Sequence, residues 1–295
     1  MYQMQFVQEA CLTNLVVSAI FKSPNQSLFN FNWDLINNHS HSFTSEYNRE
    51  DARMLLQLSL MTTEANYLET PLIPPASLET TDLIYNECPL PVIAQGFTHS
   101  RANRASNLGH ILYNEQANTL FIIFTGTSNS CLAGLDLAYH QTELEGLTNY
   151  VGGMRGHRGI YLAYHSVRPV LVSTVKKYLP RKPKIIIAGH SLGGALSQLC
   201  ALDLAYYDPI HYSFASPMIF NQMGHDAFSR FVKYSYRVAN MSDLVVLSPL
   251  PVMPNNDVFL HVGNMIHFQR NLGAYSQNHA MAYAQEFNLV NNIAP

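Results

Sequence analysis

The sequence predicts an α/β fold with a mostly parallel central sheet and helices on both faces of that sheet. Segments with strand-like and helix-like patterns alternate along the chain, which is typical of parallel strands joined by helices. The run 185–187 is apolar throughout, as expected of a strand that is buried on both faces. Residues 196–205 are apolar on nearly every side, which indicates a buried helix shortly after that strand.

The elements before this strand are predicted from their periodicity. From residue 49 to 69, apolar side chains recur at three- and four-residue steps, which indicates an amphipathic helix lying on a sheet. Two strands are expected within 109–124, joined by a turn around 114–118. A helix is expected for 159–178, with Pro169 kinking or dividing it.

The C-terminal part continues the alternation. A strand is predicted at 212–215, a helix near 223–232 and a further strand at 234–238. The segment 259–268 is interpreted as a pair of strands, and a polar loop around His279 leads into a terminal helix.

The composition favours a single folded domain behind an irregular extension. The chain has 295 residues, of which 47% are hydrophobic, and no linker rich in Pro, Gly and Ser divides it. Residues 1–48 are polar and show no sustained period. We therefore expect an irregular N-terminal extension over 1–48 and a single α/β domain over 49–295.

The charge pattern gives no reason to expect a nucleic acid as partner. The formal net charge is −3, and no cluster of basic residues could follow a phosphate backbone. Only 13% of the residues are charged, about half the usual fraction, so uncharged polar and apolar side chains must cover much of the surface. Such a surface suits transient contact with a membrane or another lipid surface.

No segment of the sequence reads as a membrane anchor or a cleaved signal. The longest apolar runs fall short of the roughly 18 to 20 residues that cross a bilayer. The apolar patch 11–21 is preceded by Glu9 and by no Lys or Arg, which is the wrong charge for a secretory signal. The sequence thus indicates a cytoplasmic protein or one exported by a non-classical route.

A serine bounded by glycines follows the apolar strand. Residues 189–193 read Gly-His-Ser-Leu-Gly, with Ser191 at the centre. A sharp strand-to-helix turn needs small residues on both sides, because a side chain there would clash with the strained backbone that lifts the serine hydroxyl clear of the sheet. Ser191 is therefore the predicted nucleophile, and the alternative is an ordinary tight turn in a structural domain.

A serine hydroxyl is a poor nucleophile at neutral pH, so it needs a base in hydrogen-bonding reach and an acid that orients the base. Asp243 follows the strand 234–238 by a short polar turn, which places a carboxylate at the carboxyl end of a strand. The later aspartates before it lie in or beside helices, and Asp257 lies in an Asn-rich turn. Asp243 is the predicted acid, and a residue that only stabilises a turn is the alternative.

Three late histidines are candidates for the base. His261 and His267 lie in the predicted strand pair, where both could be half-buried structural residues. His279 lies in a polar loop, and catalytic side chains concentrate on loops held by a rigid scaffold. Position alone leaves the choice among the three open.

The chain resembles the class 3 lipase family, the α/β-hydrolases that include triacylglycerol lipases of filamentous fungi, over about residues 50 to 287. The matching segments, in the order of the chain, are Gly109-His-Ile-Leu-Tyr-Asn114, Phe124-Thr-Gly-Thr127, Gly156-His-Arg-Gly159, Gly189-His-Ser-Leu-Gly-Gly-Ala195, Phe214-Ala-Ser-Pro217, Arg237-Val-Ala-Asn-Met-Ser-Asp243 and His279-Ala-Met-Ala-Tyr283. The resemblance implies Ser191 as nucleophile, Asp243 as acid and His279 as base.

An oxyanion hole needs hydrogen-bond donors aimed at the charge that develops on the carbonyl oxygen. One expected donor is the backbone N–H of Leu192, the residue after the nucleophile, at the start of a helix. The resemblance implies Thr127 as the second donor. It also implies that residues 128–146 cover the site. The family usually has an arginine before the glycine of this loop, where this chain has Thr125.

The resulting hypothesis is a serine hydrolase that cleaves carboxylic ester bonds of lipids, a triacylglycerol lipase or related esterase, through an acyl-serine intermediate. No metal and no organic cofactor is implied. A phospholipase A1 or a lipid acyltransferase would use the same three residues. The non-enzymatic alternative is a lipase-like module that binds lipid or protein without turnover, against which the intact set Ser191, Asp243 and His279 argues.

Overall fold

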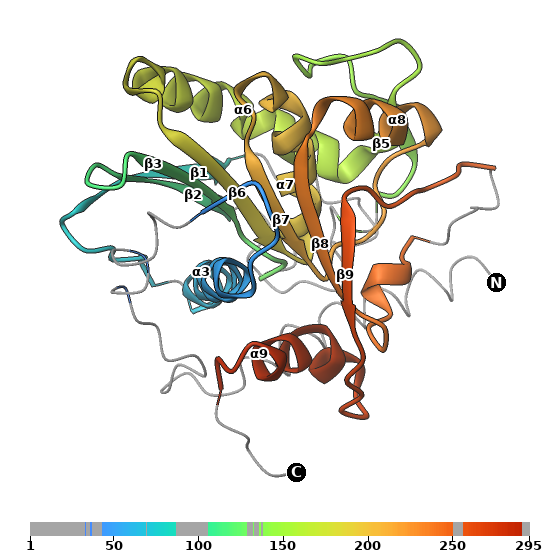
Figure 1. Cartoon of the computed structure of the whole chain (residues 1–295). Helices are drawn as coiled ribbons and strands as arrows, with labels where there is room; N and C mark the ends of the chain where they lie inside the picture. The colour runs from blue at the N-terminus through green and yellow to red at the C-terminus, as the bar shows by residue number, and fades with distance from the viewer. Residues whose placement is uncertain are drawn as a thin grey trace.

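The computed structural model describes residues 33, 36, 43–68, 70–86, 106–128, 132, 136, 138–249 and 256–290. Within these residues one sheet has seven strands in the order β1-β2-β3-β6-β7-β8-β9 (Figure 1). Its strands are β1 (Leu78–Tyr85), β2 (Ser106–Asn114), β3 (Thr119–Phe124), β6 (Lys184–His190), β7 (Ile210–Phe214), β8 (Tyr234–Asn240) and β9 (Asn264–Phe268). The pairs β1–β2 and β2–β3 are antiparallel, and every pairing from β3 to β9 is parallel. The predicted mostly parallel sheet is confirmed.

Helices cover both faces of this sheet, as predicted. In Figure 1, α6 (Arg158–Tyr178), α7 (Leu192–Asp203) and α8 (Gln222–Phe231) lie on one side, and α3 (Arg49–Tyr67) and α9 (Ala282–Glu286) on the other. A small second sheet pairs β4 (Gln141–Glu143) with β5 (Arg155–His157) in antiparallel fashion. Among the described helices, none is long and apolar enough to cross a lipid bilayer.

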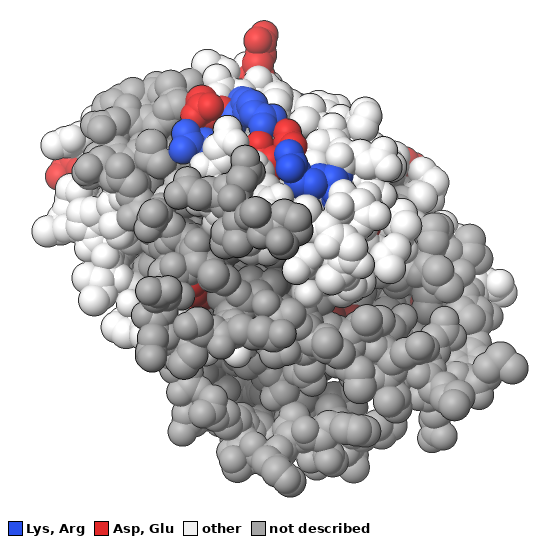
Figure 2. All heavy atoms as spheres, turned by 90° about the horizontal axis from the view of Figure 1, so that it is seen from below, with Lys and Arg blue, Asp and Glu red and all other residues white. Residues whose placement is uncertain are grey.

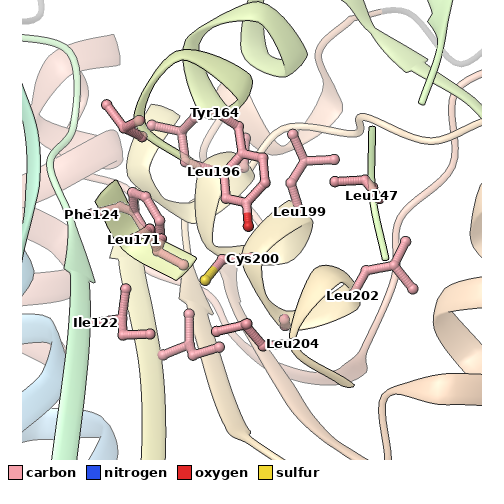
Figure 3. Close-up of a cluster of buried hydrophobic side chains, with 14 of the residues drawn as sticks. Ile122, Phe124, Leu147, Tyr164, Leu171, Leu196, Leu199, Cys200, Leu202 and Leu204 are labelled. Carbon is pink, nitrogen blue, oxygen red and sulfur yellow. The ribbon is translucent and has the colours of Figure 1, made fainter. Parts of the chain in front are cut away.

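The core has two layers because successive side chains of a strand point to opposite faces of the sheet. In β3, Ile122 and Phe124 belong to the buried cluster under α6 and α7, whereas Phe121 and Ile123 belong to the cluster under α3. Figure 3 shows the first cluster, with Cys200 of α7 among aliphatic and aromatic side chains. The central strands are apolar because both of their faces are buried.

Three local expectations were wrong or incomplete. The helix α6 runs through Pro169 as one element, so the proline does not divide it. Within 259–268 only β9 is a strand, and it pairs with β8. The edge strand β1 was not predicted, because its mostly exposed polar residues give a weak strand pattern.

The residues that precede α3 contact the domain where the structure describes them. Ile36 and Phe43 are buried in the cluster under α3, and the Phe43 and Phe121 rings meet edge to face at 5.8 Å. The Asn48 side chain caps α3 by accepting from the N–H groups of residues 50 and 51. The rest of the expected extension 1–48 lies outside the described residues.

The surface in Figure 2 carries charges of both signs. On the described part of this face, basic and acidic side chains lie next to one another. One ion pair joins α3 to the end of α9, since Arg49 lies 3.0 Å from Glu286, and Arg270, which follows β9, lies 3.3 Å from the same carboxylate.

A buried carboxylate at the end of α7 ties this helix to α6 and to the loop before β5. Asp203 accepts from Arg168 Nε at 2.7 Å, from the Tyr164 hydroxyl at 2.8 Å and from the Thr148 N–H at 2.7 Å. Burial alone would raise the pKa of this carboxyl, but these hydrogen bonds outweigh it, and the pKa lies below its usual value. Asp203 is therefore ionised in the folded protein near neutral pH.

Asp203→Asn should lower the free energy of unfolding at pH 7 by about 3 kcal/mol, because Arg168 and the other donors lose a buried charged acceptor. The depressed pKa stabilises the folded state above the unfolded-state value of about 3.9, and this contribution is lost as pH falls. Urea unfolding should therefore show a smaller difference at pH 3.5 than at pH 7. Asp208→Asn, at an exposed pair with Lys233, is the control and should change stability by less than about 1 kcal/mol. Equal losses in both variants would contradict this account.

Candidate active site

The turn between β6 and α7 holds Ser191 in a strained conformation. Its φ of 61° and ψ of −125° lie outside the regions that side chains favour. A Cβ at Gly189 would lie 2.1 Å from the carbonyl oxygen of Gly193, and a Cβ at Gly193 would lie 2.4 Å from that of Phe124. Both positions therefore require glycine. The serine side chain stands at the carboxyl end of the central strand β6, directly before the N-terminus of α7.

The three residues expected to act together lie in one hydrogen-bonded chain. His279 Nε2 is 2.8 Å from Ser191 Oγ, and His279 Nδ1 is 2.9 Å from Asp243 Oδ2. Because an ionised carboxylate only accepts, Nδ1–H donates to Asp243, and Nε2 is left to accept from the Ser191 hydroxyl. The side chains of Asp243 and His279 are 0% and 3% exposed, so water is excluded from this contact.

Two further hydrogen bonds hold the carboxylate of Asp243 in place. The Tyr283 hydroxyl donates to Asp243 Oδ2 at 3.1 Å, and the Val245 N–H donates to Oδ1 at 3.0 Å. Tyr283 lies one helical turn after His279, so base and acid are both tied to the same short segment. His279 itself lies in a π-helical turn, Gln277–Met281, a feature that is frequent at functional sites.

His190, the residue before Ser191, forms a hydrogen bond with the backbone of His279. His190 Nε2 lies 2.8 Å from the backbone carbonyl of His279, to which it donates. Burial, together with the nearby His279, lowers the pKa of His190 to about 3. The ring is therefore neutral near pH 7, and its single N–H is committed to this carbonyl.

The other two candidate histidines do not reach Ser191. His261 Nε2 lies 2.6 Å from the carbonyl of Val246, and burial lowers the pKa of His261 to about 4. His267 is exposed on β9. The structure thus brings His279, and neither of these, to the serine.

The expected oxyanion loop lies beside the serine. It follows β3, and a Cβ at Gly126 would lie 3.2 Å from the carbonyl oxygen of His190. The Thr127 hydroxyl donates to Asp136 Oδ2 at 2.6 Å. Leu192 begins α7, where backbone N–H groups lack partners within the helix. The N–H groups of Leu192 and Thr127 are thus candidates for binding an anion at this end of the sheet.

Asp136 is a site residue that the sequence reasoning did not single out. Burial of its carboxyl raises the pKa to about 7, although the hydrogen bond from Thr127 and the nearby His279 oppose the rise. His157 Nε2 lies 3.2 Å from the carbonyl of Asp136, and His157 also caps α6. No local pattern marks Asp136, because its partner Thr127 lies nine residues earlier in the chain.

The stretch 128–146, expected to cover the site, is described only in part. Leu132 and Leu144 are buried in the cluster under α6 and α7. Residues 141–143 form β4, which is paired with β5. The second half of the stretch is therefore part of the fold, and residues 129–131, 133–135 and 137 lie outside the described residues. Among the described residues, no group of three or more His, Cys, Asp or Glu side chains could hold a metal ion.

Comparison with known protein families gives a match that covers part of this site. The family model described as lipase (class 3) matches residues 121–253, which contain Ser191 and Asp243. Over this segment the chain is similar to the class 3 lipase family. The match contains β3, residues 125–127 and the strands β6 to β8, whereas His279 lies beyond its end.

Two curated relatives illustrate the likeness in sequence. A lipase of Rhizomucor miehei is 31% identical over 159 residues, which cover 50% of this chain and 41% of that protein. A secreted mono- and diacylglycerol lipase of Malassezia globosa is 26% identical over 156 residues, which cover 47% of this chain and 49% of that protein. The chain thus spans less than half the length of these relatives.

A solved structure illustrates the likeness in fold. The crystal structure of a mono- and diacylglycerol lipase from Aspergillus oryzae superposes with a TM-score of 0.57 at 20% identity, over 78% of this chain and 82% of that one. At this identity the likeness concerns the fold, and it confirms the predicted α/β architecture.

A fluorophosphonate probe should label Ser191, because His279 accepts its proton and the turn exposes its hydroxyl. Ser191→Ala should remove the label in a mass-spectrometric assay. Ser197→Ala is the matched control, since Ser197 Oγ also lies 2.9 Å from a histidine, His211, but is fully buried in α7. Labelling that survives in Ser191→Ala would show that another residue reacts.

Proposed function

We propose that this protein is a serine hydrolase that cleaves carboxylic ester bonds of lipids. The observation that carries the proposal is the hydrogen-bonded chain from Ser191 through His279 to Asp243. It lies at the carboxyl ends of the strands, in a chain whose residues 121–253 match the class 3 lipase model. Acylglycerols are the proposed substrates, because the curated relatives are named as lipases and the Malassezia globosa relative as a mono- and diacylglycerol lipase.

The reaction has two halves. In the first, Ser191 Oγ attacks the ester carbonyl carbon while His279 Nε2 takes its proton, and Asp243 stabilises the imidazolium. The N–H groups of Leu192 and Thr127 bind the oxyanion, together with the Thr127 hydroxyl when Asp136 does not hold its proton. His279 then gives the proton to the leaving alcohol, which leaves an acyl-Ser191 ester. In the second half, His279 takes a proton from water, the resulting hydroxide attacks the acyl group, and the proton returns to Ser191 as the carboxylic acid leaves.

Contact with a lipid surface is proposed from the residues around the acid. Met241, Leu244 and Leu247, on the segment that contains Asp243, are 51%, 59% and 55% exposed. Apolar side chains clustered on such a segment favour an apolar partner over water. A phospholipase A1 or a lipid acyltransferase would use the same triad, but no contact in the described residues favours a phosphate head group or a second acceptor.

We also propose that the protein acts outside the cell, because the Malassezia globosa relative is named as secreted. Detection of the protein in the culture medium rather than in the cell fraction supports this. Retention of all activity in the cell fraction contradicts it.

His279→Ala should lower kcat on short-chain acylglycerols by about 10⁴-fold or more, because the triad acts as a unit. His267→Ala, which changes an exposed residue of β9, is the control and should keep kcat within about twofold. The same protein samples should also be assayed on phosphatidylcholine and in the presence of a free alcohol acceptor. These assays measure phospholipase and acyl-transfer activity. Turnover that persists in His279→Ala would overturn the assignment of the base.

Asp136→Asn should change the dependence of kcat on pH. Above about pH 7 the ionised Asp136 only accepts, so it holds the Thr127 hydroxyl proton and places a negative charge near the oxyanion. Below this pH the neutral carboxyl can donate to Thr127 Oγ1 and release the hydroxyl proton toward the substrate. Wild-type kcat should therefore fall as pH rises through about 7, by up to about a hundredfold for one lost donor.

The side-chain amide introduced by Asp136→Asn donates at every pH, so this variant should lack that fall when kcat is measured from pH 6 to 9 on a soluble ester. Identical pH profiles for the two proteins would remove Asp136 from control of the oxyanion loop.

A further inference from the structure

The loop that carries Thr127 lacks the arginine usual in the family, and other residues hold it. Thr125 stands in the position of that arginine, is completely buried, and its hydroxyl has no hydrogen-bond partner in the described part of the chain. The N–H of Thr125 donates to the carbonyl of Leu108 at 2.9 Å, which fixes only the start of the loop. The residues on either side of Thr127 are held from α3.

Thr63 of α3 binds the backbone immediately before Thr127. The Gly126 N–H donates to Thr63 Oγ1 at 2.9 Å, and the Thr63 hydroxyl donates to the carbonyl of Ser59 at 2.8 Å. Since the only proton of this hydroxyl is used within α3, its oxygen is oriented as an acceptor toward Gly126. Thr63 is 6% exposed, so water does not compete for the Gly126 N–H.

Asn66, one turn further along α3, binds the residue immediately after Thr127. Its amide nitrogen donates to Ser128 Oγ at 2.6 Å and to the carbonyl of Asn107 at 2.9 Å. Both amide hydrogens are thus committed, and Ser128 is joined to the first residues of β2. Residues three apart on a helix lie on the same face, so Thr63 and Asn66 meet the loop together.

We propose that α3 positions the oxyanion loop, with Thr63 and Asn66 as the positioning residues on either side of Thr127. This inference rests on the proposed role of Thr127 in binding the oxyanion. The contact between Gly126 and Thr63 also sets how far the loop lies from Ser191. A Cβ at Gly126 would lie 3.2 Å from both Thr63 Oγ1 and the carbonyl oxygen of His190. The loop is therefore held between α3 and the residue that precedes Ser191.

The helix is suited to this task because it is rigidly placed. Its inner face packs on the sheet through a continuous set of buried apolar residues, and Asn48 caps its N-terminus. A displacement of about 1 Å at a catalytic group costs up to about a hundredfold in rate. Two hydrogen bonds that hold the loop to a fixed helix can therefore affect kcat.

Three threonine variants test the proposal. Thr63→Val keeps the shape of the side chain and removes the acceptor of Gly126, and Thr63→Ser keeps the acceptor. Thr62→Val is the matched control, since Thr62 is completely buried and its hydroxyl donates within α3, to the same Ser59 carbonyl at 2.9 Å. The measurements are kcat and KM on a soluble short-chain ester, the rate at which a fluorophosphonate modifies Ser191, and the melting temperature.

Thr63→Val should lower kcat and the rate of phosphonylation by about tenfold, with KM changed by less than about twofold, because the loop meets the charge chiefly in the transition state. Thr63→Ser and Thr62→Val should stay within about twofold of wild type. If Thr63→Val does not fold, Asn66→Ala, at a partly exposed position, carries the same test and the same expected loss.

The proposal is overturned if Thr63→Val and Thr62→Val lose similar stability and keep wild-type kcat and phosphonylation rate per folded molecule. Its failure is distinct from failure of the proposed function. A wild-type protein that is phosphonylated at Ser191 but hydrolyses no lipid ester refutes the function, and the phosphonylation rates of the variants still decide the role of α3.

Discussion

The site depends on the close approach of three backbones at the end of β6. The strand β6, the first turn of α7 and the end of β3 come so near one another that Gly189 and Gly193 leave no room for a Cβ. At this approach Ser191 adopts a positive φ, and α7 begins directly after it at Leu192. It also sets the oxyanion loop beside the serine, because the nearest backbone atoms to Gly193 belong to Phe124 and Thr125. The relative placement of Ser191 and the proposed oxyanion donors thus depends on one packing contact.

Buried histidines around this contact act as fixed donors. His190 and His157 each donate from Nε2 to a backbone carbonyl, that of His279 and that of Asp136. Burial lowers the pKa of His190 to about 3 and that of His157 to about 4, so both rings are neutral, with one N–H each, across the physiological range. Burial acts in the opposite direction on Asp136, whose pKa rises to about 7. The same desolvation therefore makes two residues insensitive to pH and one sensitive to it near neutrality.

Much of the fold and the centre of the site could be predicted from the sequence because their causes are local. The β6 strand, the glycine-bounded turn and α7 follow from about twenty consecutive residues, and Asp243 follows from the rule that chemistry gathers at strand ends. The residues alone left the base open among three histidines, because the choice depends on which loop folds back over Ser191. The family resemblance was the reason for choosing His279 over the other two.

What the sequence did not reveal consists of contacts between distant segments. Asp136 meets Thr127 over nine residues, Tyr283 meets Asp243 over 40, and Thr63 meets Gly126 over 63. Threonine and asparagine are common in helices and loops for many reasons, so their types alone carry no signal. The strand β1 was missed for a related reason: as an edge strand it exposes most of its polar residues, and its pairing with β2 determines its conformation.

The absence of the arginine in the oxyanion loop shows how such long-range contacts can substitute for a residue of a local motif. Ordering an arginine side chain costs about 2 kcal/mol of conformational entropy, whereas a β-branched threonine in a helix has few rotamers to lose. Thr63 and Asn66 sit on a helix that is already ordered by its burial against the sheet. Holding the loop from α3 therefore adds little entropic cost beyond that of folding the domain, and it makes the placement of Thr127 depend on the packing of α3 rather than on one long side chain. The small Thr125 then fits where a longer residue would otherwise have to be accommodated, which is consistent with its complete burial.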